Sequence, residues 1–228
     1  MRVLIFGATG MVGQGALREC LRAADVERVQ TVGRTATGQQ HPKLREMVRP
    51  SLMDFSDVES QLQNFDACFF CLGVSSAGMS EAQYTQVTYD LTLAAARTLA
   101  RLNPQMVFVY VSGAGTDSSE RGRSMWARVK GRTENALQQL PFKAVYLFRP
   151  GVIQPLDGIR SQTGSYRMFY SLFRPFFPIL RALFPLQILS TRSIGQAMLA
   201  VARHGATKAV LEARDIGAIA RTSQPVTG

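Results

Sequence analysis

Short apolar runs alternate with longer amphipathic stretches along most of this chain. The short runs are rich in Val, Ile, Leu and Phe, which is typical of strands that are buried on both faces of a sheet. The longer stretches repeat apolar residues at helical spacing, and one of them ends at the stop signal Asn103-Pro104. The pattern predicts strands over residues 3–6, 28–32, 44–49, 67–72, 106–111, 143–148 and 209–211. It predicts helices over residues 11–23, 56–61, 80–102, 124–140 and 193–203.

This alternation predicts an α/β fold, namely a Rossmann-type doubly wound parallel sheet with a small C-terminal helical cap. A chain of 228 residues can bury one good core, so we expect a single domain over residues 1–228. Within it, residues 1–155 are the expected Rossmann core, and residues 156–221 are the expected cap and last sheet elements. Residues 222–228 are expected to form a frayed tail.

The first expected strand runs into a glycine-rich turn that opens the first helix. The turn has the spacing G-x-x-G-x-x-G. Gly7 permits a tight turn, Gly10 lets the backbone approach a pyrophosphate, and Gly13 lets the helix pack close to the sheet. The helix N-terminus adds free N–H donors and a positive dipole end. The alternative is a turn that binds no ligand. The dinucleotide site expected from the turn comprises Gly7, Thr9, Gly10, Met11, Val12 and Gly13.

The end of the second expected strand indicates which dinucleotide is bound. Sites that prefer NAD place an acid about 20 residues further on, where it holds the ribose 2′-hydroxyl. This strand ends instead in Val32-Gly33-Arg34-Thr35, without an acid. The guanidinium of Arg34 suits a 2′-phosphate, so we expect NADP(H) as the cofactor in preference to NAD(H). The alternative is a solvated arginine, since arginines are common in this chain.

Further segments follow the later strands in a familiar arrangement. They are Asp54-Phe55, Cys71-Leu72-Gly73-Val74, Val111-Ser112-Gly113-Ala114, Trp126 to Gly131 with Lys130, and Arg149-Pro150-Gly151-Val152. With the glycine turn, these segments resemble the short-chain dehydrogenase/reductase superfamily in its atypical branch, close to Tat-interacting-protein-like oxidoreductases and epimerase/dehydratase-related NAD(P)-binding proteins. The resemblance covers roughly residues 1–155 well and the remainder loosely. It implies that Asp54 and Phe55 contact the adenine, that Cys71, Leu72 and Gly73 line the cofactor, and that Pro150, Gly151 and Val152 pack against the nicotinamide.

The same resemblance implies three catalytic positions, at Ser112, Trp126 and Lys130. Enzymes of the superfamily use Tyr-x-x-x-Lys: the tyrosine gives a proton to a carbonyl, the lysine binds the nicotinamide ribose, and a serine holds the substrate oxygen. Here Trp126 takes the tyrosine position, and its indole N–H cannot act as a proton-transfer acid near neutral pH. Trp126 can still hydrogen-bond a carbonyl oxygen, stack on an aromatic substrate or pack at the cofactor edge. A solvated Lys130 and a plain strand-end Ser112 are the alternatives.

Two other sets of residues resemble metal or redox sites. Cys68 and Cys71 have the spacing C-x-x-C, but on a strand their side chains point to opposite faces. We therefore interpret them as buried small hydrophobic side chains. His41 and His204 are far apart and no carboxylate cluster accompanies them, so we expect no metal site.

Charge and cysteine content limit the partners. The net charge is +10, yet the basic residues form neither a clustered stripe nor a nucleic-acid-binding motif, so we expect no nucleic acid partner. The chain starts directly on the first strand, so we expect no signal peptide. Three cysteines give no disulfide framework, which favours a reducing cytoplasm. We expect a small-molecule substrate and a monomer or homodimer.

Residues 166–189 form an apolar segment that is interrupted by regularly spaced arginines and prolines. Its length approaches that of a membrane-spanning helix, but the interruptions argue against a single spanning helix. We favour a helical cap over an apolar substrate cleft. A dimer surface and a membrane-surface patch are the less favoured alternatives.

Two functions fit these observations. The first is an NADP(H)-dependent oxidoreductase that transfers a hydride to or from a small or lipophilic carbonyl or alcohol, with Ser112 positioning the oxygen, Lys130 the ribose, and Trp126 shaping the pocket. The second is a non-catalytic NADP(H)-binding module that senses the redox state of the cofactor or organises a partner. The lean towards the enzyme rests on analogy with the superfamily rather than on physics.

Overall fold

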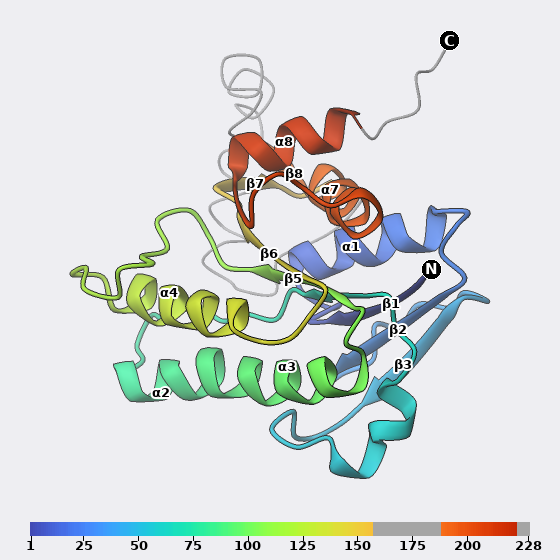
Figure 1. Cartoon of the computed structure of the whole chain (residues 1–228), viewed down its shortest axis with the longest axis horizontal. Helices are drawn as coiled ribbons and strands as arrows, with labels where there is room; N and C mark the ends of the chain where they lie inside the picture. The colour runs from blue at the N-terminus through green and yellow to red at the C-terminus, as the bar shows by residue number, and fades with distance from the viewer. Residues whose placement is uncertain (157–187, 223–228) are drawn as a thin grey trace.

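The computed structural model describes residues 1–156 and 188–222, which build a seven-stranded sheet with helices on both faces (Figure 1). The strand order is β3-β2-β1-β4-β5-β6-β9, and all neighbouring strands are parallel. The order changes direction between β1 and β4, and ligands of such sheets bind at this point, outside the carboxyl ends of the strands. The predicted Rossmann-type fold is thus confirmed. The strands are β1 (Arg2–Phe6), β2 (Arg28–Gly33), β3 (Leu44–Val48), β4 (Ala67–Phe70), β5 (Val107–Val111), β6 (Ala144–Arg149) and β9 (Val210–Glu212).

The helices form one layer on each face of the sheet (Figure 1). One layer contains α1 (Met11–Arg22), α7 (Thr191–His204) and α8 (Ala213–Thr222). The other contains η1 (Ser56–Leu62), α2 (Glu81–Thr85), η2 (Gln86–Asp90), α3 (Leu91–Leu102) and α4 (Met125–Gln138). Because each layer buries a separate apolar surface, the core has two halves, one on each side of the sheet.

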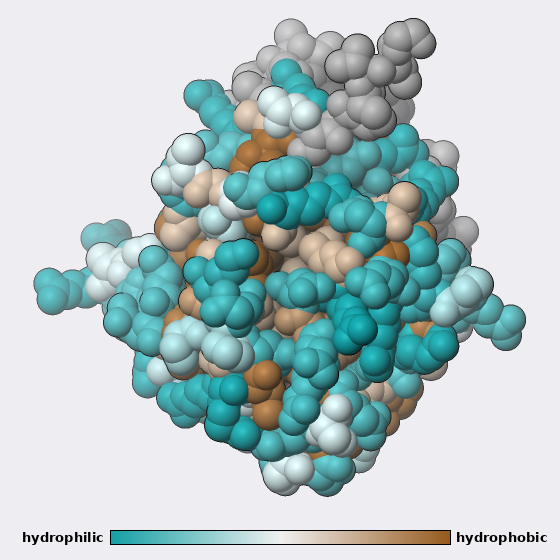
Figure 2. Space-filling view, turned by 45° about the vertical axis from the view of Figure 1, so that its right-hand side comes forward, coloured by the Kyte–Doolittle hydropathy of each residue, from teal (hydrophilic) through white to brown (hydrophobic). Residues whose placement is uncertain are grey.

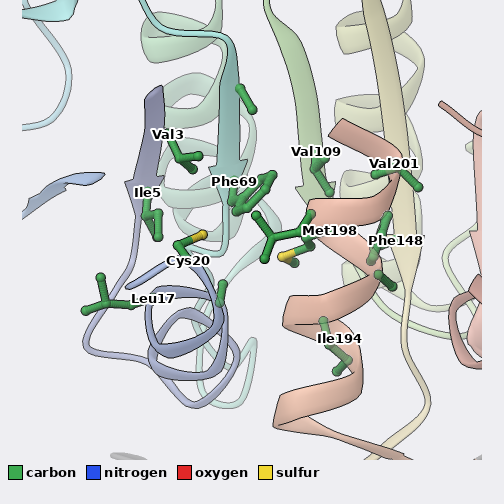
Figure 3. Packing of buried hydrophobic residues seen from close by; sticks show 14 of the residues in the cluster. Val3, Ile5, Leu17, Cys20, Phe69, Val109, Phe148, Ile194, Met198 and Val201 are labelled. Carbon is green, nitrogen blue, oxygen red and sulfur yellow. The ribbon is translucent and has the colours of Figure 1, made fainter. Parts of the chain in front are cut away.

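The strand β4 shows how the sheet supplies both halves of the core. Phe69 packs with Cys20 of α1 and Met198 of α7, and Figure 3 shows these side chains converging on one face of the sheet. Cys68 belongs to the other half of the core, while Cys71 packs against the first half. The prediction that the two cysteines of the C-x-x-C spacing point to opposite faces is therefore confirmed.

Most predicted elements are present with small shifts at their ends, but three features were not predicted. The expected helix over residues 80–102 contains the π-helical turn η2 between α2 and α3. The short strands β7 (Val152–Gln154) and β8 (Ile188–Ser190) pair in parallel in a second, two-stranded sheet. Finally, α8 follows β9 directly and buries Ile216 and Ala220 on one face. The frayed tail was expected to begin at Thr222, but Thr222 is the last residue of α8.

Most of the apolar segment 166–189 lies outside the described residues, so its three interpretations stay predictions. Only its last two residues are described, and Ile188 and Leu189 are buried in β8. Within residues 1–156 and 188–222, none of the helices is both long and apolar enough to cross a membrane. Hydrophilic residues cover most of the molecular face in Figure 2, with hydrophobic residues showing in smaller areas between them.

Candidate functional site

The glycine turn lies between β1 and α1, next to the point where the strand order changes. Gly7 has a φ of 74°, and the backbone N–H of Gly10 donates to its carbonyl oxygen at 3.0 Å. A Cβ atom on Gly13 would lie 2.1 Å from that same oxygen. A side chain at Gly13 would therefore push the helix away from the turn, which is the packing that the sequence predicted for this glycine.

The start of α1 is left open for an anion. Gly10 is the N-cap residue, it has no side chain to cap the helix, and the first turn contains no acidic residue. The backbone N–H groups at the start of the helix are therefore available to a phosphate. The turn itself is fastened by Gln14, whose Nε2 donates to the carbonyl oxygen of Thr9 at 2.8 Å. These features fit the pyrophosphate of a dinucleotide.

The loop after β4 lies directly against the glycine turn. A Cβ atom on Gly7 would lie 2.7 Å from the backbone nitrogen of Leu72. The backbone N–H of Cys71 donates to the carbonyl oxygen of Phe6 at 3.0 Å, and Gly73 is exposed. The structure thus brings Cys71, Leu72 and Gly73 to the same edge of the sheet as the turn. Burial raises the pKa of the Cys71 thiol to about 12, so the group stays a neutral thiol at neutral pH.

The expected adenosine end of the site lies where β2 ends. Arg34 follows the last residue of β2 and is exposed. Asp54 is also exposed, and hydrogen bonds from the backbone and the hydroxyl of Ser56 hold the pKa of its carboxyl below the usual range. The side chain of Phe55 is only 1% exposed and packs edge-on against Phe6 in the core. Its ring therefore has no face on which an adenine could stack, and the expected contact of Phe55 with the adenine stays a prediction for its backbone.

Ser112 is positioned at the end of β5, but its hydroxyl is already engaged. Its Oγ donates to Oε1 of Glu134 at 2.6 Å and lies 3.2 Å from the carbonyl oxygen of Phe148. The residue is only 9% exposed. A hydroxyl has a single proton to donate, and here that proton points into the protein. The expectation that Ser112 holds a substrate oxygen is therefore not supported by this geometry.

Lys130 and Trp126 lie one turn apart on α4, as their spacing predicted. Nζ of Lys130 donates to the backbone carbonyl oxygen of Ser112 at 2.6 Å and lies 6.0 Å from the ring centre of Tyr110. Burial lowers the pKa of Lys130 to about 8, and the nearby carboxylate of Glu134 opposes this shift. The ring of Trp126 lies against Gly115 of the loop that follows β5.

Glu134 is the residue of this site that sequence reasoning missed. Its side chain is fully buried, and it accepts hydrogen bonds from Ser112 and from Nε and Nη2 of Arg149. These bonds raise the pKa of the Arg149 guanidinium. A signal was present, because Glu134 follows Ala127 by two helical turns and so places an acid on the buried face of α4.

The segment after β6 reaches the same place. The backbone N–H of Ala114 donates to the carbonyl oxygen of Pro150 at 2.9 Å, which holds the end of β6 beside the loop after β5. Pro150 is buried, whereas Gly151 and Val152 are exposed. The structure therefore brings Pro150, Gly151 and Val152 next to Ser112, as expected for residues beside a nicotinamide, whereas Arg34 and Asp54 lie at the other end of the site.

Comparison with known proteins identifies the family. The sequence matches the NAD dependent epimerase/dehydratase family over residues 3–123, which is more than half of the 228 residues. This chain belongs to that family. It is 30% identical to the protein fmp52, mitochondrial, of Emericella nidulans over 158 residues, which are 66% of each protein. It is 28% identical to the protein HTATIP2 of Rattus norvegicus over 154 residues, 66% of this chain and 62% of that protein.

The solved structures agree with this assignment at the level of the fold. The enzyme WbmF of Bordetella bronchiseptica, solved in complex with NAD⁺, has a TM-score of 0.67 and 17% identity to this chain, with coverage of 100% of this chain and 79% of WbmF. The family model thus shows a member of the NAD dependent epimerase/dehydratase family, and the similarity to WbmF shows that the two proteins share a fold. The resemblance inferred from the sequence is confirmed.

Two findings limit what these relatives say about the chain. The chain covers just under two thirds of the length of these curated relatives. In addition, the expectation of a cytoplasmic protein is wrong, because relatives from Emericella nidulans and Eremothecium gossypii are named mitochondrial. Cysteine content reports only on redox conditions, and a reducing environment is not a single compartment.

The absence of a metal site stays a prediction. In the part of the chain that the structure describes, His, Cys, Asp and Glu side chains do not form a group of three that could hold a metal ion.

Proposed function

We propose that this protein binds NADP(H) and works as a cofactor-binding module rather than as a carbonyl reductase with the usual side-chain machinery. The observation that carries the proposal is the hydrogen bond from the Ser112 hydroxyl to the buried carboxylate of Glu134. Together with the tryptophan at position 126, this bond leaves neither of the two usual hydroxyl groups to act on a substrate carbonyl.

The cofactor part of the proposal rests on the glycine turn and on Arg34. The close approach of Gly13 to Gly7 and the uncapped start of α1 form the phosphate-binding part of the site. The exposed guanidinium of Arg34 supplies a fork of N–H donors for a 2′-phosphate. In residues 1–156 and 188–222 its side chain takes part in no hydrogen bond or ion pair, so it is free for a ligand. The bound nicotinamide would supply hydride chemistry, and the module would respond to its redox state.

A second candidate is an oxidoreductase acting on a small or lipophilic carbonyl, and Lys130 is the observation that favours it. With a pKa of about 8, the Lys130 side chain is protonated at neutral pH and can still release its proton. In this candidate Lys130 gives that proton to the carbonyl oxygen, in place of the missing tyrosine.

A combined binding and turnover experiment separates the two candidates. Purified protein is titrated with NADPH, NADP⁺, NADH and NAD⁺ by thermal shift, and consumption of NADPH is then followed with a panel of aliphatic, aromatic and quinone carbonyls. The module predicts binding of NADPH without turnover. A ligand at one hundred times its Kd stabilises the fold by about 2.7 kcal/mol, so binding is readily detected.

The variants Lys130→Arg and Trp126→Tyr complete this experiment. Arginine keeps a charged N–H donor but does not release its proton at neutral pH. Turnover by the wild type that Lys130→Arg abolishes at saturating NADPH would establish the oxidoreductase and overturn the module. Turnover that appears only in Trp126→Tyr would show that the wild type is inactive because it lacks the tyrosine, and not because the Ser112 hydroxyl is bound to Glu134.

A further inference from the structure

We propose that Glu134 is the positioning residue of the nicotinamide half of the cofactor site. This inference rests on the proposed binding of NADP(H), and it assigns to Glu134 the task of holding three separate chain segments together. None of these segments belongs to the glycine turn or to the adenosine end. The loss of Glu134 should therefore affect the two halves of the cofactor unequally.

The first segment held by Glu134 is the end of β5. The hydroxyl of Ser112 donates to Oε1 of Glu134 at 2.6 Å, and this bond connects residues 22 positions apart in the sequence. Because the Glu134 side chain is fully buried, water cannot replace either partner without opening the packing of α4 against the sheet. The bond fixes the strand end from which the exposed loop after β5 departs.

The second segment is the end of β6, which precedes Pro150. Arg149 binds both carboxylate oxygens of Glu134, through Nε at 3.1 Å and through Nη2. The two planar groups form a bidentate pair, the geometry that most strongly fixes the direction of both side chains. Nη2 of Arg149 also donates to the hydroxyl oxygen of Ser118 at 2.6 Å, and Nη1 donates to Oε1 of the exposed Glu212 at 3.3 Å. The carboxylate thus anchors the chain just before the segment expected beside the nicotinamide.

The third segment is the part of α4 that carries Lys130. Glu134 lies one helical turn after Lys130, and its negative charge favours the ammonium form of that lysine. Both side chains bind Ser112. Nζ of Lys130 donates to the backbone carbonyl oxygen of Ser112, and Glu134 accepts a hydrogen bond from the Ser112 hydroxyl. Lys130 and Glu134 therefore both hold Ser112, one through its backbone and the other through its hydroxyl. A shift of Glu134 would move Ser112 and, with it, Lys130.

A purely structural role would make a different prediction. Breaking a buried ion pair by removing one charge commonly destabilises a protein strongly. Such a loss alone would reduce the amount of folded protein and would lower the apparent affinity for every ligand by the same factor. A positioning role instead weakens only those ligands that reach the nicotinamide half.

The test compares NADP⁺ with 2′,5′-ADP, which carries the adenosine half and the 2′-phosphate but no nicotinamide. Dissociation constants are measured by calorimetry on the folded 228-residue chain for the wild type and for Glu134→Gln. The glutamine keeps the shape of the side chain but replaces one acceptor oxygen by an NH₂ group and removes the charge that Arg149 needs. The matched control is Glu212→Gln, which removes the exposed carboxylate partner of the same arginine.

We expect Glu134→Gln to weaken NADP⁺ at least tenfold and 2′,5′-ADP less than twofold, with Glu212→Gln close to the wild type for both. Equal weakening of both ligands, or no change in either, would overturn the positioning role. If the wild type binds neither ligand, the proposed function is itself wrong. Should Glu134→Gln not fold, Arg149→Lys tests the same pair, because lysine keeps the charge but loses the bidentate fork. It must then show the same unequal weakening of the two ligands.

Discussion

The ammonium group of Lys130 donates to the backbone carbonyl oxygen of Ser112 at 2.6 Å. This bond connects the middle of α4 with the end of β5, where the expected nicotinamide end of the site begins. It also uses only one of the three N–H groups that a lysine carries. Two donors remain for a cofactor ribose, so the bond positions the lysine without disabling it.

The first prediction concerns the pH dependence of cofactor binding. Burial lowers the pKa of Lys130 to about 8, from the ordinary value of 10.5, so the ammonium is lost as pH rises through this value. If the ammonium holds the ribose, the affinity for NADP⁺ should be highest below pH 8. Above pH 8 it should fall by up to about tenfold per pH unit. Calorimetric titrations between pH 7 and 10 measure this slope. The 2′-phosphate of NADP⁺ does not contribute to it, because the second phosphate pKa of about 6 lies below this range.

The control for this prediction is Lys130→Met, which cannot titrate. It should bind NADP⁺ more weakly at pH 7, and its affinity should not decline above pH 8. Identical affinity profiles for both proteins would show that Lys130 does not bind the cofactor. Stability changes in the opposite sense. The unfolded chain holds the proton up to a higher pH than the folded chain, so the contribution of Lys130 to the free energy of unfolding rises between pH 8 and 10.5.

The second prediction uses Trp126, which is the only tryptophan in the chain. Its emission overlaps the absorption of reduced nicotinamide, so excitation energy passes to NADPH when the two rings are close. NADPH should therefore quench the tryptophan emission and show sensitised nicotinamide emission. NADP⁺ and 2′,5′-ADP, which lack the reduced ring, should give no sensitised emission. Binding of NADPH without energy transfer would show that Trp126 does not lie at the edge of the cofactor.

The third prediction is that Arg34 selects the phosphorylated cofactor. Hydrogen bonds to a charged group contribute about 1.5–3 kcal/mol, so Arg34→Ala should weaken NADPH roughly 10- to 100-fold and leave NADH unchanged. Arg97→Ala is the control, because Arg97 is also exposed and its loss changes the net charge equally. Equal losses for NADPH and NADH, or equal effects of the two variants, would assign the preference to net charge alone.

The fourth prediction concerns the glycine turn in the absence of cofactor. A Cβ on Gly13 would lie 2.1 Å from the carbonyl oxygen of Gly7, whereas a Cβ on Gly73 would have no atom within 4 Å. Gly13→Ala should lower the free energy of unfolding by about 3 kcal/mol, and Gly73→Ala should change it by less than about 0.5 kcal/mol. Urea denaturation of the two variants measures both values. A Gly13→Ala protein as stable as the wild type would show that the turn has a looser conformation.

Much of the fold followed from local patterns in the sequence. The buried strand β4 consists of four apolar residues, and the turn from Gly7 to Gly13 contains its own conformational requirements. Elements with weaker local signals were missed. Each of the strands β7 and β8 has three residues, and they pair although they are more than 30 positions apart in the sequence.

The sequence by itself determined the layered α/β architecture, the glycine turn and the absence of a tyrosine at position 126. These features depend on strand and helix periodicity and on backbone conformation, which neighbouring residues control. Only the tertiary structure decided which polar groups are already used. It buried the ring of Phe55, turned the Ser112 hydroxyl towards Glu134, and paired that carboxylate with Arg149. A buried polar group takes whichever partner the packing places beside it, and that partner can lie anywhere in the chain.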